Sequence, residues 1–464
     1  MNLAEEFRSF LAVHFRYPKS HELVKYAAAG PRMGISRRFR TNSTSFYKVD
    51  KVMDISRYSA ATPTSGIPRV VAHLVKRAVD EGVTLAIWHK GRLVPVECDW
   101  SGRVTFPAQH WRKEPSRFSL QKIYMDLMRI RPWFAILGAA FSIPLVRLLG
   151  NGLVSLFGSH GSGVPRSSIP LRDMTYFLPE VPDAETSDRL SLALQYEEDF
   201  EISILVHDLL PVSHPQHFDA AANSEFLLYL QLVVRARSLV AGSPVLRNQL
   251  ELFASSMGLS EKPTIHIHDL PIDNSPLDMV LSAAPNAVDT ALFIGGFQSR
   301  KGLDVAGSLF ARGEMGNLVL AVVGVPKPTN PLEMSLFRQL KFLENVRLLG
   351  VLSDQELWSE FSKAEVVVYL SAAEGYGLPV LEGLSAGKPV VCIDTPINRY
   401  FKVKYGGIFL IPHKLGNFSE TDLASALGRA VNEKYRTPDN LPLHPSDWAS
   451  AVFSDVFSGK GCKR

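Results

Sequence analysis

The sequence has few cysteines, and they are scattered. Cys98, Cys392 and Cys462 are odd in number, far apart and without the spacing of metal ligands. We therefore expect neither a disulfide framework nor a zinc site, and a reducing compartment such as the cytoplasm fits the chain. An acidic metal motif is also missing, so we expect no metal and no cofactor.

A strong excess of either charge is missing as well. The 464 residues carry 50 basic and 46 acidic side chains, a net charge of +4. So small an excess gives no broad basic field for a phosphate backbone, and nucleic acid is not an expected partner. With 46% hydrophobic and 21% charged residues, the chain is predicted to be globular and long enough for two domains.

Long apolar runs are also rare. The N-terminus carries acidic residues early and no apolar core, so we expect no signal peptide. The stretch 133–157 comes nearest to a membrane span, but Pro144, Arg147 and the turn at 150–152 interrupt it. Basic residues precede it, which would suit a peripheral contact with the inner membrane. The alternative is an insertion, near 110–165, that packs on its own domain.

Strand and helix patterns alternate along both halves. In the second half, short apolar runs at 290–297, 317–324, 346–350, 365–371, 389–394 and 407–412 alternate with helical segments at 303 onwards, 353–362, 379–386 and 419–433. This pattern predicts an α/β domain with a doubly wound parallel sheet. The first half has strands at 51–56, 83–89, 202–209, 238–243 and 264–268, and helices at 66–82, 186–199, 222–237 and 244–257. We predict Rossmann-like domains over 1–284 and 285–440, and a final helix within 441–464 that crosses back to the first.

The strongest local signal is SAAEGYGLPVLEGLSAG at 371–387, directly after a predicted strand. Gly375 and Gly377 would let the backbone approach a ligand, and Pro379 suits the first turn of a helix. A helix N-terminus at this place exposes amides that can bind a diphosphate. These are the amides of Tyr376, Gly377 and Leu378.

Two carboxylates flank that anion site. Glu374 lies in the loop and Glu382 lies one turn into the helix. A carboxylate beside a diphosphate is repelled unless it faces hydroxyl groups, so both should accept hydrogen bonds from sugar or ribose. This EGYGLPVLE setting resembles the signature of family 4 retaining glycosyltransferases with the GT-B fold. The resemblance implies that Glu374 contacts the donor sugar and that Glu382 holds the ribose.

A second signal is IGGFQSRKGLDV at 294–305, between a strand and a helix. Two cations there could neutralise a departing diphosphate, as a metal ion would. The family has a lysine that matches Lys301, and Arg300 lies beside it. Gly296, which we also expect at the donor site, takes the place where many members have an arginine, which leaves open whether Arg300 supplies that phosphate contact.

Two further signals lie in the first half. The string 64–70 resembles, with one residue inserted, a TGIxRV string of bacterial surface-polysaccharide mannosyl- and hexosyltransferases, and it indicates Gly66 as a donor contact and Arg69 as an acceptor-side residue. The pair His207 and Asp208 ends an apolar strand. The family often has such a pair here, with the histidine near the transferred sugar and the aspartate toward the acceptor.

The expected function is transfer of a hexose from a nucleoside-diphosphate sugar to a glycan or lipid-linked glycan, across a central cleft. His207, Lys301 and Glu374 are the predicted catalytic residues. Same-face attack, with the leaving phosphate taking the acceptor proton, is what the resemblance implies. A sugar-nucleotide epimerase of the same fold, or a sugar-nucleotide-binding protein without activity, are the alternatives.

Overall fold

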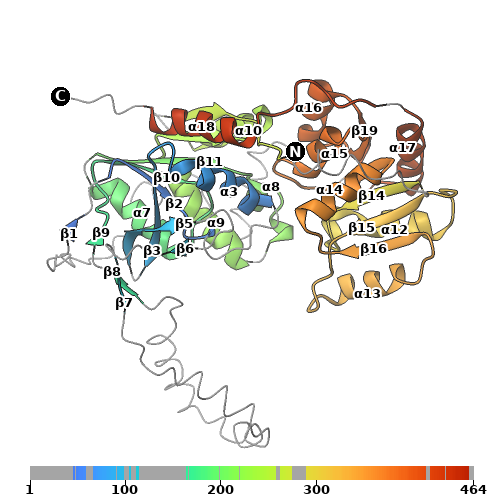
Figure 1. Cartoon of the computed structure of the whole chain (residues 1–464), viewed down its shortest axis with the longest axis horizontal. Helices are drawn as coiled ribbons and strands as arrows, with labels where there is room; N and C mark the ends of the chain where they lie inside the picture. Colours follow the sequence, from blue (N-terminus) through green and yellow to red (C-terminus); the bar gives the residue numbers. More distant parts are fainter. Residues whose placement is uncertain are drawn as a thin grey trace, which may run out of the picture.

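The computed structural model describes two α/β domains side by side (Figure 1). The described residues are 45–46, 49–58, 66–89, 91–98, 104–105, 111–113, 163–165, 167–197, 199–218, 220–257, 262–273, 289–413, 418–433 and 435–458. The apolar stretch 133–157, the loop 59–65 and Cys462 lie outside them. Within the described ranges, no helix is long and apolar enough to cross a membrane.

The first domain is built on a seven-stranded sheet in the order β13-β12-β11-β10-β2-β3-β4. Every neighbouring pair is parallel except β3 with β4, which forms an antiparallel edge. Its strands are β2 (Lys51–Asp54), β3 (Thr84–His89), β4 (Arg92–Pro95), β10 (Met174–Leu178), β11 (Phe200–Val206), β12 (Ser238–Ala241) and β13 (Thr264–Ile267). The central strand β10, which is buried along its whole length, was not predicted.

Helices cover both faces of this sheet. They are α3 (Gly66–Ala78), α7 (Ala184–Tyr196), α8 (Leu210–Ser213), α9 (Ala220–Val233) and α10 (Pro244–Ser256), with the short 3₁₀ turn η2 (Pro215–His217). Three small strand pairs complete the domain: β1 (Ser45–Phe46) with β9 (Ser167–Ser168), β5 (Glu97–Cys98) with β6 (Val104–Thr105), and β7 (Trp111–Lys113) with β8 (Gly163–Pro165). The β7–β8 pair brings the two ends of the predicted insertion side by side.

The second domain has a six-stranded sheet in the order β16-β15-β14-β17-β18-β19, parallel throughout. The strands are β14 (Thr290–Ile294), β15 (Val319–Val323), β16 (Val346–Gly350), β17 (Val366–Tyr369), β18 (Val390–Ile393) and β19 (Ile408–Ile411). The helices are η3 (Ser299–Lys301), α12 (Leu303–Ala311), α13 (Pro331–Leu340), α14 (Asp354–Lys363), α15 (Leu378–Ser385), α16 (Pro396–Tyr405) and α17 (Glu420–Asn432). The order reverses between β14 and β17, where doubly wound sheets bind ligands.

The last helix, α18 (Pro445–Phe457), returns to the first domain and packs on α3, β10 and β12 (Figure 1). Trp448 and Phe453 lie on the apolar face of this helix and are buried. Asp455 Oδ2 lies 2.7 Å from His268 Nε2, just after β13, and 3.1 Å from His266 Nδ1 on β13, so the last helix is fastened to the edge strand of the first sheet.

Candidate functional site

The loop and helix after β17 present an open helix N-terminus. All four residues of β17 are buried, and α15 begins at Leu378 with Pro379 in its first turn. Gly377 is the N-cap with φ 96°, a left-handed conformation that favours glycine, and no side chain caps the helix. Pro379 has no N–H and Val380 N donates to Gly377 O at 3.0 Å, whereas no described residue accepts from the amides of Gly377 and Leu378, which could bind an anion.

One carboxylate oxygen of Glu374, in this loop, accepts three hydrogen bonds. Its Oε1 accepts from Arg300 Nη1 at 2.7 Å, from Ser371 Oγ at 2.6 Å and from Lys301 Nζ. Lys301 Nζ also lies 5.2 Å from the centre of the Tyr369 ring, and its alkyl chain packs where a Cβ on Gly295 would lie. The structure therefore brings together the glutamate and the two cations that the sequence singled out separately.

The charges of this cluster depend on one another. Burial by itself would raise the pKa of Glu374, but Lys301 and Arg300 outweigh burial and hold that pKa below its usual value. Burial lowers the pKa of Lys301, and Glu374 opposes that change. The cluster is an ionised carboxylate between two cations, so it can accept hydrogen bonds from hydroxyls and present positive charge to a phosphate.

Glu382 is paired across the domain boundary. It is buried one turn into α15, and its Oε1 accepts from Arg69 Nη1 in the first turn of α3 at 2.7 Å. Arg69 Nε also lies 3.9 Å from Asp354 at the start of α14. The sequence placed Arg69 with the acceptor, whereas the structure places it against the carboxylate predicted to hold the ribose.

His207 and Asp208 follow β11 and meet the loop of Glu374. His207 Nε2 lies 2.7 Å from Pro179 O, and because a carbonyl only accepts, Nε2 carries the proton and Nδ1 is left as an acceptor. Burial lowers the pKa of His207 to about 4, so the ring is neutral at pH 7. Burial also raises the pKa of Asp208 to about 6, with Glu374 adding to the effect.

Gly375 is a point of close contact between the two domains. A Cβ on this residue would lie 2.4 Å from Asp208 Cβ and 2.6 Å from His207 O. We expected this glycine to let a ligand approach its backbone. In the structure, the lack of a Cβ instead lets the first domain approach. The carboxyl ends of β11 and β17 therefore face each other.

Tyr376 contributes its backbone to the site, while its side chain turns toward the chain segment between the domains. Its hydroxyl accepts from Leu270 N at 3.0 Å and donates to Asp269 at 3.2 Å. Tyr400 and Lys404 of α16 also bind Asp269. Sequence patterns gave no sign of this interdomain cluster, because Asp269 lies more than a hundred positions before Tyr376, Tyr400 and Lys404.

Two predicted glycines lie at strand or helix ends. Gly296 follows β14 with φ 66°, and a Cβ on the neighbouring Gly324 would lie 2.7 Å from Gly296 Cα, so the ends of β14 and β15 approach closely here. Gly66 begins α3 with φ 52° and is exposed, with no atom within 4 Å of an added Cβ. The loop that precedes Gly66 is outside the described residues.

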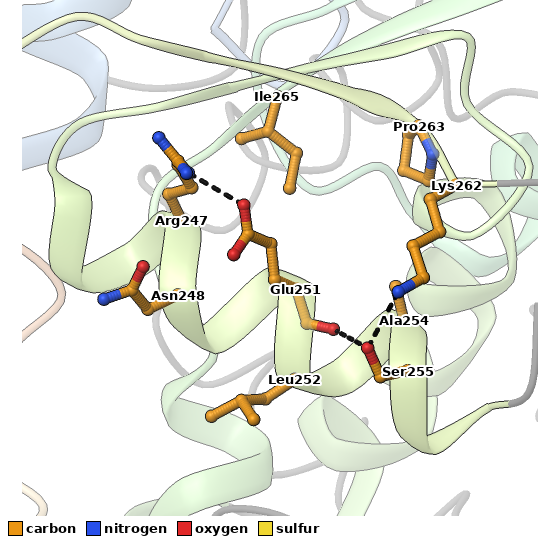
Figure 2. Close-up of a pocket in the computed structure, with 9 residues that line it drawn as sticks. All are labelled: Arg247, Asn248, Glu251, Leu252, Ala254, Ser255, Lys262, Pro263 and Ile265. Carbon is orange, nitrogen blue, oxygen red and sulfur yellow. Dashed lines mark hydrogen bonds and ion pairs between the residues drawn. The ribbon is translucent and has the colours of Figure 1, made fainter.

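A separate open hollow of about 760 Å³ lies beside α10 and β13 (Figure 2). Within it, Arg247 pairs with Glu251 at 2.8 Å, and Lys262 donates to the hydroxyl of Ser255 at 3.0 Å. It shares no residue with the predicted site. The described residues contain no group of three or more histidine, cysteine or acidic side chains placed to hold a metal ion.

The second domain is similar to a known protein family. Residues 282–427 match the family model described as Glycosyl transferases group 1. A stretch of 50 residues is 47% identical to O-antigen chain mannosyltransferase B of Escherichia coli, and it spans 11% of this chain and 13% of that protein. The chain thus matches only a small part of that relative's length.

Solved structures resemble almost the whole chain. Sucrose-phosphate synthase from Thermosynechococcus elongatus has a TM-score of 0.51 at 15% identity, covering 88% of this chain and 96% of that one. A trehalose-6-phosphate synthase gives 0.53 at 13%, covering 89% and 99%. An Anabaena protein in complex with UDP and glucose gives 0.50 at 14%, covering 88% and 96%. The predicted GT-B fold and the predicted family resemblance are confirmed.

Proposed function

Because the chain has the GT-B fold and a glycosyltransferase group 1 region at 282–427, we propose that it is a retaining glycosyltransferase with a nucleoside-diphosphate hexose as donor. The observation that carries this proposal is the convergence of Lys301 and Arg300 on Glu374 beside an uncapped helix N-terminus. The cations of η3, after β14, and the carboxylate and free amides after β17 together suit a diphosphate joined to a sugar.

In the proposed reaction, an acceptor hydroxyl oxygen bonds to the anomeric carbon as the bond from that carbon to the diphosphate breaks. The acceptor proton goes to the leaving diphosphate on the same face, which retains the anomeric configuration. Lys301, Arg300 and the first amides of α15 stabilise the charge that develops on the leaving oxygen. Glu374 orients the hexose hydroxyls, and the neutral His207 offers Nδ1 to a hydroxyl near the reacting carbon.

The acceptor in this proposal is a glycan or lipid-linked glycan, and it lies against the His207–Asp208 end of the first domain. The similarity to an O-antigen mannosyltransferase favours bacterial surface polysaccharide synthesis. We place the reaction in the cytoplasm, at the face of the inner membrane, with 133–157 as the peripheral contact. Co-sedimentation with anionic liposomes that weakens with salt supports this contact, and protein that stays in the supernatant contradicts it.

A screen of nucleoside-diphosphate hexoses by thermal shift, followed by transfer assays, tests the proposal. We expect one donor to raise the unfolding temperature and, with a glycan acceptor, to give a product whose anomeric configuration by NMR matches the donor. Isomerisation of the sugar without an acceptor would instead indicate an epimerase. Binding without turnover over a broad acceptor panel would indicate a binding protein.

A further inference from the structure

Arg69 and Glu382 form a buried ion pair between the two domains. The side chain of Glu382 is 5% exposed and that of Arg69 is 19% exposed. Among the described residues, no second hydrogen bond reaches this carboxylate beside that from Arg69. A buried carboxylate needs such a partner, so Arg69 now fills the place that ribose hydroxyls would take at Glu382.

A ribose diol would bind the same buried carboxylate as this guanidinium. Two neighbouring hydroxyls bind a carboxylate most completely when each donates to a different oxygen, and Arg69 already occupies Oε1. If the ribose displaces Arg69 from Glu382, the guanidinium requires another anion as a partner. Asp354 is 59% exposed and 3.9 Å away, which makes it a weak partner. The diphosphate proposed at Leu378 lies four residues before Glu382, about 6 Å along the helix axis and within the swing of an arginine side chain.

Glu374 shows the same arrangement, with Arg300 and Lys301 on its Oε1. A nucleotide sugar brings hydroxyls for the carboxylates and phosphates for the cations. We propose that Arg69 is a further diphosphate-binding residue, supplied by the first domain, that leaves Glu382 when the ribose arrives and moves to the diphosphate. This inference rests on the proposed function. If Arg69 moves in this way, the phosphates of the donor, rather than its base or ribose, hold the two domains together.

The affinities for a nucleoside, its monophosphate and its diphosphate distinguish an arginine that moves to the diphosphate from one that stays on Glu382. Calorimetry on the full chain would use uridine, UMP and UDP, or guanosine, GMP and GDP, whichever series the wild type binds. We expect Arg69→Met to weaken diphosphate binding roughly 10-fold or more, the loss of a charge-assisted hydrogen bond, while nucleoside binding is unchanged or tighter. The matched control is Arg77→Met, an ion-paired arginine on the same helix that contacts Glu81 and Ser450, and it should bind all three like wild type.

Other outcomes overturn the exchange. Equal weakening of nucleoside and diphosphate would mean that Arg69 is a fixed brace for Glu382, and unchanged binding would mean a plain interdomain ion pair. If Arg69→Met does not fold, the neutral pair Arg69→Met with Glu382→Gln should still show a smaller gap between diphosphate and nucleoside affinity than Glu382→Gln alone, and an equal gap contradicts the inference. A wild-type chain that binds no nucleoside diphosphate would instead contradict the proposed function.

Discussion

Gly375 packs directly against Asp208, and this contact sets how closely the two domains meet. A Cβ added to Gly375 would lie 2.4 Å from Asp208 Cβ, too close for any real side chain. Because the obstructing atoms include the backbone carbonyl of His207, a side-chain rotation cannot relieve the clash. The donor loop and the proposed acceptor site are therefore coupled through one glycine.

Gly375→Ala should separate the domains and slow transfer. Reacting groups held in different domains lose alignment when the domains shift, and a displacement of about 1 Å can cost roughly 100-fold in rate. We expect such a loss in kcat/KM, with a larger radius of gyration in solution scattering. Gly428→Ala in α17 is the control, since nothing lies within 4 Å of its added Cβ. Wild-type rate and scattering for Gly375→Ala would refute the coupling.

Lys301→Ala should remove charge stabilisation of the leaving diphosphate. Loss of a preorganised donor of this kind costs about 2–4 kcal/mol in the transition state. Steady-state kcat/KM measures the loss, and Lys341→Ala, an exposed lysine of the same domain, serves as control. A rate within about three-fold of wild type, less than 1 kcal/mol, would show that Lys301 does not stabilise the leaving diphosphate.

Asp208→Asn should stabilise the chain at neutral pH but not near pH 4. Burial raises the folded-state pKa of Asp208 from 3.8 to about 6, so the folded chain binds more protons in that window and loses stability as pH rises through it. His207, with a pKa lowered to about 4, has the opposite sign there, and the comparison with wild type removes its effect.

Asparagine keeps an acceptor for Leu210 N, which donates to Asp208 Oδ1 at 2.9 Å. The gain at pH 7.5 should be roughly 1–2 kcal/mol, less than the full shift implies because the side chain is partly open to solvent. Denaturant titrations at about pH 4 and 7.5 measure it. An equal difference at both pH values would show that the pKa of Asp208 is unshifted.

Transfer should continue in excess EDTA. Lys301, Arg300 and the amides of α15 are proposed to do the work that a divalent cation does at other diphosphate sites. Initial rates with and without the chelator check this. Activity that disappears with EDTA and returns with magnesium or manganese would show that a metal takes part.

Much of the second domain could be predicted from sequence because its parallel strands are short buried runs bounded by glycine or proline. The predicted strand at 346–350 coincides with β16, and the others differ by one to three residues at their ends. Several elements were missed, among them β10 and α16. MTYFL at 174–178 follows the insertion without a turn signal, and Pro396–Tyr405 carries polar residues around most of its surface.

The site was predictable only where its residues are neighbours in the chain. The 371–387 string located Glu374, Glu382 and the helix N-terminus, because loop, glycine and proline follow one another there. Contacts between distant segments left no local pattern. The pairing of Arg69 with Glu382, and of Asp269 with Tyr376, depends on how two domains pack and could not be read from spacing.

Discrimination of the ribose diol by Glu382 is the most direct test of a nucleotide-sugar site. Calorimetry would compare the preferred nucleoside diphosphate with its 2′,3′-dideoxy analogue on wild type and on Glu382→Ala. We expect the analogue to bind wild type roughly 10-fold or more weakly, and both ligands to bind the variant alike, because the hydroxyls then lack their acceptor. If the wild type binds both equally, or if the variant still discriminates between them, Glu382 does not hold a ribose and the account is wrong.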